Sequence, residues 1–180
     1  AARRRGARVI LVSGPTALAA PVGIELVPVT SARQMREAVL QRLEEATVVI
    51  KAAAVADYRP AMRAEQKIKK GLEGSLILPL EKNPDILAEL GSRKGNRLLV
   101  GFAAETADLL ENARKKLTEK NLDLIVANDV SRSDAGFDVD TNAVRLLYRD
   151  GSGEELPLLG KDEVADQLLD RIARLLRPTT

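Results

Sequence analysis

Short apolar runs alternate with amphipathic stretches along the chain, and this alternation predicts alternating strands and helices. Short runs bounded by turn residues are typical of buried strands, and they fall at residues 8–12, 24–29, 47–51, 75–80, 97–102 and 122–127. Apolar residues spaced three or four apart predict helices over 31–45, 84–90 and 105–120. The alternation predicts an α/β fold with a Rossmann-like, mostly parallel sheet and helices on both of its faces.

The expected helix ends have recognisable capping residues. Ser31 is a favoured N-cap for the first helix, and Gln34 stands where a capping box needs it. Asn83 is the expected cap of the second helix, with Pro84 in its first turn. The apolar stripe of the first helix consists of Ala32, Met35, Val39 and Leu43.

The C-terminal part has a different pattern. Residues 142–149 and 155–159 flank a turn at 150–153 and predict a β-hairpin. A final amphipathic helix follows, with Val164, Leu168, Ile172 and Leu175 on one face. With 180 residues and 19.5 kDa, the chain is expected to form a single domain, residues 1–180.

The first residues resemble the end of a helix. Residues 1–5 are helix formers that become basic toward the C-terminal side, and Gly6 is a typical C-cap. Because a domain seldom begins with the tail of a helix, we expect at least one further strand and helix before this point in the parent protein. An N-terminal strand with its Gly-rich loop would then be missing from the predicted sheet.

Composition narrows the possible chemistry. The chain has neither Cys nor His, which excludes thiol nucleophiles, imidazole bases and the usual zinc sites. A net charge of +2 and 2% aromatic residues argue against a general nucleic-acid binder. No apolar run approaches the roughly 20 residues of a membrane span, so a cytoplasmic location is expected. GxGxxG, P-loop and GxSxG motifs are all absent.

The most informative stretch is residues 51–70. It begins as a strand end, continues with small residues, offers one acid at Asp57, and then presents Lys67, Lys69 and Lys70. Small residues allow a ligand to approach the backbone, an acid can hold a metal or a sugar hydroxyl, and lysines attract phosphate. The stretch therefore points to a nucleoside triphosphate with a divalent cation. The alternative is a strand end followed by a solvated, mobile loop over 61–74.

Further polar or small segments follow other predicted strands. They occupy residues 52–57, 82–85, 101–106 and 128–129. The carboxyl ends of parallel strands are where open α/β sheets bind ligands. Lys116 and Lys120 are one helical turn apart, so they either share a solvated face or point at one phosphate or base edge. Asn83 has the simpler alternative of capping a helix.

Several collinear motifs resemble one family. KAAAVADYRP, KIKK, KNPDIL, VGFAAET, NLDLIVANDV and the run with Gly136, Phe137, Asp140 and Asn142 resemble the bacterial phosphopantothenate–cysteine ligase family. This is the synthetase half of the bifunctional coenzyme A biosynthesis protein. The resemblance implies a Rossmann-like sheet with a small strand region for dimerisation. It also implies CTP-dependent joining of 4′-phosphopantothenate to cysteine through an acyl-cytidylate, with Mg²⁺ as cofactor.

The resemblance also implies roles for particular residues. Asp57 matches the acid that serves the ribose or the metal, and Lys67 matches a loop lysine in the reaction. The implied nucleotide contacts are Lys51, Ala52, Ala53, Asp57, Lys67, Pro84, Asp85, Ile86, Leu87, Phe102, Lys116 and Lys120. The implied partners are a second copy in a homodimer and a fused decarboxylase domain. The family's Gly-rich N-terminal segment has no counterpart here, so the fragment could bind CTP yet fail to complete the amide.

Two alternatives remain open at this point. One is a nicotinamide-dependent Rossmann oxidoreductase, against which the absence of GxGxxG and of a Tyr-x-x-x-Lys pair argues. The other is a non-catalytic CTP-binding or dimerisation fragment.

Overall fold

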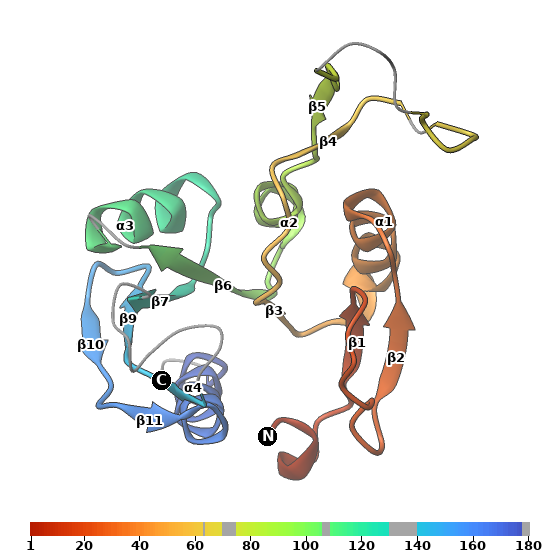
Figure 1. Ribbon diagram of the computed structural model, residues 1–180. Coiled ribbons are helices and arrows are strands. Elements are labelled where there is room, and N and C mark those ends of the chain that lie inside the picture. The colour runs from red at the N-terminus through yellow and green to blue at the C-terminus, as the bar shows by residue number, and fades with distance from the viewer. Residues whose placement is uncertain (63, 70–74, 106–108, 130–139, 178–180) are drawn as a thin grey trace.

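The computed structural model describes residues 1–62, 64–69, 75–105, 109–129 and 140–177, and it confirms the mixed α/β class (Figure 1). The central sheet has five strands in the order β10-β9-β7-β6-β3. Three neighbours are parallel: β3 (Val48–Lys51), β6 (Leu98–Glu105) and β7 (Leu124–Asp129). The antiparallel pairs are made by β9 (Val144–Tyr148) and β10 (Gly153–Glu155). They form the predicted hairpin, but its second strand lies at 153–155 and not at the predicted 155–159.

The first two strands form a separate parallel pair within the described residues. β1 (Ile10–Ser13) pairs with β2 (Glu25–Pro28), with Leu11 opposite Leu26. Neither strand is hydrogen-bonded to β3. The predicted mostly parallel arrangement is therefore correct, but it is divided into two sheets.

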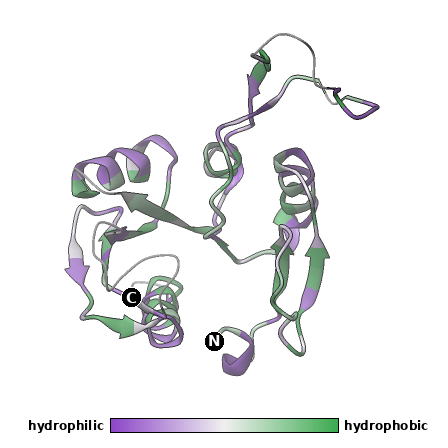
Figure 2. Cartoon of the chain, in the orientation of Figure 1, coloured by the Kyte–Doolittle hydropathy of each residue, from purple (hydrophilic) through white to green (hydrophobic). Residues whose placement is uncertain are grey.

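Helices cover the central sheet on both faces and create two cores. One core lies beneath α1 (Ala32–Arg42), α2 (Ile86–Arg93) and α3 (Leu109–Glu119). The other lies beneath α4 (Lys161–Leu175), which buries Val164, Leu168 and Ile172 but leaves Leu175 43% exposed. Figure 2 shows the hydrophobic character of β6, which lies between these layers and contributes Leu99 to one core and Val100 to the other.

An arm that the sequence pattern did not predict projects from the body (Figure 1). Its base is an antiparallel pair of β4 (Tyr58–Pro60) and β5 (Leu80–Lys82). The strand predicted at 75–80 is wrong in position, because only its last residue enters this pair and residues 75–79 have no regular structure. The reason is that each arm strand is fixed by pairing with its distant partner and not by a local apolar pattern.

Helix ends required smaller corrections. The cap of α2 is Asp85, whose Oδ1 accepts from Ala88 N at 3.0 Å, and not Asn83. The described part of the helix expected over 105–120 is α3 (Leu109–Glu119), and Glu105 belongs instead to β6, which continues to that residue along β7. Ser31 caps α1 as predicted, but Gln34 Oε1 accepts from Thr30 N and not from Ser31.

The remaining short elements tie the ends of the chain to the body. A 3₁₀ turn at Arg3–Arg5 ends at Gly6, whose φ of +88° and N–H bond to Arg3 O confirm the predicted C-cap. Arg5 pairs with Asp166 and Asp170 on α4, at 3.2 and 2.6 Å. A further turn, η2 (Leu43–Glu45), follows α1, while β8 (Thr141–Asn142) pairs with β11 (Leu159–Gly160) just before α4. Across the described residues, no helix has the length and apolar content of a membrane span.

Candidate functional site

The carboxyl ends of β3, β6 and β7 lie at one edge of the central sheet. Lys51, the last residue of β3, is in register with Gly101 of β6, and Ala104 of β6 is in register with Asn128 of β7. The exposed segment after β3, beginning with Ala52 and Ala53, also leaves the sheet at this edge. The strand ends that the sequence predicted to lie together therefore meet at one edge of the sheet.

Three charged side chains from different elements meet beside this edge, and we call Lys51, Asp85 and Lys120 the charged cluster. Lys120 Nζ lies 3.0 Å from Asp85 Oδ2. Lys51 Nζ donates to the carbonyl of Ala53 at 2.9 Å. Asp85 also caps α2, so its carboxylate links the start of that helix to the end of α3.

The cluster perturbs its own ionisation. Burial lowers the pKa of the Lys51 ammonium, and the positive charge of Lys120 lowers it further, with Asp85 opposing both. Burial acts to raise the pKa of Asp85, but the Ala88 N–H and the Lys120 ammonium outweigh it, and the pKa lies below its usual range. Two ammonium groups and one carboxylate leave a net positive site that favours a bound anion.

Close backbone packing between α2 and the end of α3 places Lys120. A Cβ on Gly91 would lie 1.9 Å from the Lys120 carbonyl oxygen, so only glycine allows this approach. Asn121 follows with φ +52° and donates through Nδ2 to Gly91 O at 2.8 Å. These contacts fix the α3 terminus against α2 and thereby direct Lys120 toward Asp85.

The structure separates other predicted nucleotide contacts. Ile86 and Leu87 are 3% and 6% exposed in the core beneath α2, so their side chains do not line the edge. A Cβ on Gly101 would lie 2.8 Å from Leu122 Cδ1 and 3.1 Å from Leu87 Cδ2, so this glycine allows the core side chains to pack closely on β6. Phe102 packs on the opposite core, beneath α4. Pro84 is half-buried immediately before Asp85.

Asn83 joins the arm to the segment after β3. Its Nδ2 donates to Ala56 O at 2.8 Å, its backbone N–H donates to Asp57 O at 2.7 Å, and its Oδ1 accepts from Arg59 Nη1 at 3.0 Å. Sequence reasoning missed both Arg59 and this role of Asn83. Arg59 and Asn83 are brought together by the pairing of β4 with β5. No local sequence pattern indicates this pairing, so the contact could not be predicted.

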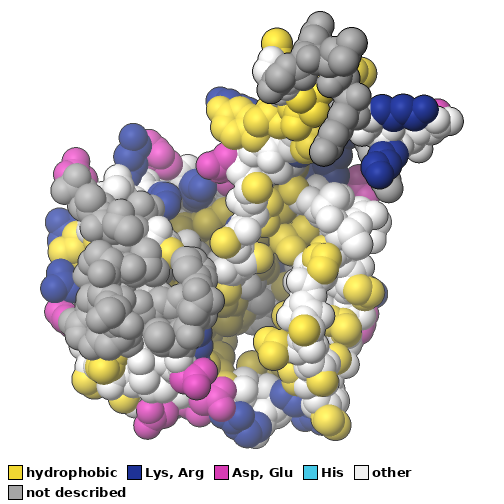
Figure 3. All heavy atoms as spheres, in the orientation of Figure 1, with side chains coloured by type: hydrophobic (Ala, Val, Ile, Leu, Met, Phe, Trp, Pro, Cys, Tyr) yellow, Lys and Arg dark blue, Asp and Glu magenta, His cyan; other side chains and the backbone are white. Residues whose placement is uncertain are grey.

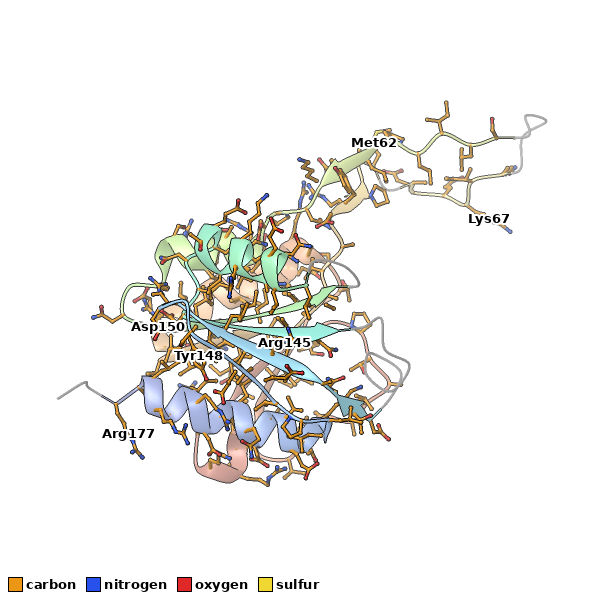
Figure 4. The ribbon with its side chains drawn as sticks, turned by 90° about the vertical axis from the view of Figure 1, so that its left-hand side faces the viewer. Met62, Lys67, Arg145, Tyr148, Asp150 and Arg177 are labelled. Carbon is orange, nitrogen blue, oxygen red and sulfur yellow. The ribbon has the colours of Figure 1, made fainter. Side chains whose placement is uncertain are left out.

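The predicted lysines do not all gather at the cluster. Lys116 is half-buried on α3, one turn before Lys120. Lys67 lies in the outer part of the arm, away from the body (Figure 4). Within a single chain it is therefore distant from Lys51 and Lys120. Lys70, Gly136 and Phe137 lie outside the described residues.

The described residues contain no group of three or more acids that could hold a metal. Asp57 is exposed, and its carboxylate has no hydrogen bond or ion pair within the described part of the chain. Mg²⁺ is often held by one or two carboxylates together with substrate phosphates. A single free carboxylate on the segment between β3 and the arm fits that mode of binding.

Asn128 presents a buried polar group at the end of β7. Its Nδ2 lies 3.5 Å from Asn142 Oδ1, and its own Oδ1 has no partner within the described residues. A buried acceptor without a donor is costly, so this oxygen is suited to receive a hydrogen bond from a ligand.

Comparisons with known proteins identify relatives along nearly the whole chain. Residues 1–176 match the family described as "DNA/pantothenate metabolism flavoprotein C-terminal domain". The chain is 51% identical over 180 residues to the "Coenzyme A biosynthesis bifunctional protein CoaBC" of Bacillus subtilis, covering 99% of this chain and 44% of that protein. It is 47% identical over 175 residues to the protein of that name from Escherichia coli K12, covering 96% of this chain and 43% of the relative. The chain thus spans less than half the length of these relatives.

Solved structures agree with these relatives. The crystal structure of the C-terminal domain of CoaBC superposes with a TM-score of 0.81 at 46% identity, over 97% of this chain and 78% of that one. The DNA/pantothenate metabolism flavoprotein from Streptococcus pneumoniae shares the fold, with a TM-score of 0.80 at 21% identity over 96% of this chain and 83% of that one. The resemblance found in the sequence motifs is confirmed. The chain belongs to the DNA/pantothenate metabolism flavoprotein C-terminal domain family.

Proposed function

We propose that this domain performs the ligase step of coenzyme A biosynthesis, the CTP-dependent joining of 4′-phosphopantothenate to cysteine. The observation that carries the proposal is the charged cluster at the carboxyl ends of parallel strands, where Lys51 and Lys120 face one edge beside Asp85. The name of the relatives, coenzyme A biosynthesis bifunctional protein, supports the pathway. The assignment of CTP as the nucleotide rests on the family that the sequence motifs resemble.

The first step would need charge stabilisation more than proton transfer. The carboxylate of 4′-phosphopantothenate attacks the α-phosphorus of CTP, the bond to the pyrophosphate oxygen breaks, and an acyl-cytidylate and pyrophosphate form. A carboxylate is already ionised, so no base is required, and the lack of His is no obstacle. Lys51 and Lys120 would stabilise the charge that develops on the phosphate oxygens.

The second step forms the amide. The amine of cysteine attacks the acyl carbon, the bond to the cytidylate oxygen breaks, CMP leaves, and the amine nitrogen loses one proton. Mg²⁺, when bound, would neutralise phosphate charge. Asp57 is the carboxylate that would hold it, and the small residues Ala52 and Ala53 would let the nucleotide approach the backbone.

The proposal is tested by nucleotide binding to this chain. We expect calorimetry to detect CTP with Mg²⁺, and Lys120→Gln to weaken that affinity about tenfold, as for loss of a charge-assisted hydrogen bond. Asp57→Asn should weaken only the Mg²⁺-dependent part. Lys115→Gln is the matched control, since Lys115 lies on the exposed side of α3, 3.9 Å from Glu119.

The same measurements separate the alternatives. Binding of NADP in place of CTP would contradict the proposal and favour an oxidoreductase. CTP binding without release of pyrophosphate, in the presence of 4′-phosphopantothenate, would favour a non-catalytic binding fragment.

We further propose that the domain acts as a homodimer joined through the arms. The arm exposes apolar side chains, including Met62 at 78% and Ile77 at 89%, and Figure 3 shows hydrophobic atoms gathered there. Exposed apolar surface of this kind favours a protein interface. Because Lys67 lies far along the arm, a second copy could receive it at its charged cluster (Figure 4).

Complementation tests this exchange. Lys67→Gln and Lys120→Gln are each expected to be inactive alone in pyrophosphate release. Mixed after unfolding and refolding, they should recover about one quarter of wild-type activity, because half of randomly formed dimers carry one intact site of two. Native mass spectrometry confirms that mixed dimers form. If they form and remain inactive, Lys67 does not act across the dimer.

A further inference from the structure

A second group of cations lies outside the charged cluster, in a groove between α1 and the base of the arm. The groove encloses about 460 Å³. Arg33, Arg36 and Glu37 of α1 line one side, and Arg59, Lys82 and the Asn83–Pro84 segment line the other. Four cationic side chains and one acidic one line it, and although Glu81 and Glu89 pair with three of the four cations, the group keeps a positive charge that favours an anion.

Two guanidinium groups in the groove converge on a single oxygen. Arg33 Nη2 lies 3.2 Å from Glu81 Oε1, and Arg59 Nη2 lies 2.7 Å from the same atom. Arg59 is held in place, since its Nη1 also donates to the Lys82 carbonyl at 2.6 Å. A fixed arginine and a second arginine from another element are thus arranged around one anionic oxygen.

Donors remain unused in the lining of the groove. The exposed Lys82 has no side-chain hydrogen bond or ion pair within the described residues, and Arg33, 61% exposed, uses only one of its nitrogens. Arg36 differs, because Glu89 binds it through both Nε and Nη2 at 2.5 and 2.6 Å. Arg36 therefore forms a wall of the groove, while Arg33, Arg59 and Lys82 can serve a ligand.

We propose that this groove binds a phosphate group, and that Glu81 occupies the anion position when no ligand is present. A phosphate dianion offers more acceptor oxygens than a carboxylate and would engage Arg33, Arg59 and Lys82 together. The phosphate could come from inorganic phosphate or pyrophosphate, or from a phosphate monoester. Pro84 lines the groove and precedes Asp85 directly, so this site adjoins the charged cluster without sharing its lysines.

Removing the Glu81 carboxylate and removing a cation of the groove should change the affinity for phosphate in opposite directions. Inorganic phosphate is titrated into the protein at constant ionic strength, with amide NMR shifts as the readout. Glu81→Gln should raise phosphate affinity about three- to tenfold by releasing both arginines, whereas Arg33→Gln and Lys82→Gln should each lower it about threefold, as exposed charge contacts do. Lys115→Gln should change nothing.

The positions of the shifted amides test whether phosphate binds in the groove. Shifts are expected at the amides of Arg33 and Asn83, and they should persist in Lys120→Gln, so failure of the ligase proposal would leave this one standing. Tighter binding of 4′-phosphopantothenate than of inorganic phosphate would identify the ester as the source, and equal binding would identify the free ion. Shifts confined to the charged cluster, or an unchanged affinity in Glu81→Gln, would leave an adventitious ion only and overturn the proposal.

Discussion

At the scale of single residues, Asp85 combines two roles that can be separated. Its Oδ1 caps α2 by accepting from Ala88 N, and its Oδ2 holds Lys120 at 3.0 Å. Asn is also a good N-cap but carries no charge. The same position therefore supports a helix end and sets the charge of the site.

This division predicts different outcomes for two substitutions. Asp85→Ala removes the cap and should lower the free energy of unfolding by about 1 kcal/mol, while Asp85→Asn should retain most of that stability. Both variants release Lys120, so both should change the salt dependence of CTP binding. Urea denaturation and calorimetry measure the two effects. Equal destabilisation by both variants would contradict the capping role.

Sequence reasoning could locate residues at the sheet edge, but not which of them meet. The family resemblance implied nucleotide contacts for Lys51 and Lys120, whereas the helical spacing of Lys120 alone was equally consistent with a solvated face. Their contact with Asp85 depends on Gly91 packing against the Lys120 carbonyl, which is a non-local feature. The burial of Ile86 and Leu87 and the distance of Lys67 from the body also depend on non-local packing, so the sequence pattern did not predict them.

At the scale of elements, long apolar patterns were reliable and short paired strands were not. β3, β6, β7, β9 and α4 were predicted close to their observed positions, since their side chains define the two cores, whereas the exposed three-residue strand β10 was not. The arm strands have only three residues each and are fixed by contacts such as Arg59 with Glu81 at 2.7 Å. The local spacing of apolar residues does not indicate which distant strand a short strand pairs with.

The hairpin of β9 and β10 is fastened to α4 by a polar clamp. Glu154 of β10 accepts from Tyr148 Oη and pairs with Arg171 Nη2 at 2.9 Å. Hydrogen bonds from Arg171 and then Tyr148 lower the pKa of Glu154 from its usual 4.5 to about 2. Burial and the same bond raise the pKa of the Tyr148 hydroxyl.

The clamp makes stability depend on pH with a defined sign. Because the folded pKa lies below the unfolded one, the unfolded chain binds more protons between pH 4.5 and 2, and stability falls as pH falls through that window. Glu154→Gln should cost about 1 kcal/mol at pH 7, since the carboxylate is partly solvent-screened. The gap to wild type should shrink toward pH 2 in urea denaturation.

Glu155→Gln provides the control for this measurement. Glu155 is the next residue of β10 and pairs with Arg145 at 3.1 Å, with side chains that are 65% and 43% exposed. Its substitution should shift stability little at any pH. Parallel pH profiles for Glu154→Gln and wild type would show that the clamp does not carry the acid dependence.

At the scale of the whole molecule, the division into two sheets leaves apolar side chains uncovered. Within the described residues β1 pairs only with β2, and β3 pairs only with β6. Leu11 and Leu26, opposite each other, are 38% and 42% exposed, and Ile50 of β3 is 42% exposed. Val12 and Val49 instead pack on the core beneath α1 and α2, so these two strands share that core without hydrogen bonds between them.

The two sheets should therefore differ in local stability. Hydrogen bonds between β1 and β2 depend on one neighbouring strand, whereas β6 and β7 lie inside the five-stranded sheet and bury Val100, Ile125 and Val126 completely. We expect native-state hydrogen exchange to show opening of β1 and β2 at a lower free energy than opening of β6 and β7. A longer chain that adds a parallel strand between β1 and β3 should raise protection on both facing edges and cover Leu11 and Ile50. Equal protection of the two sheets in this chain would contradict the expected difference, because it would mean that core packing alone couples them into one unfolding unit.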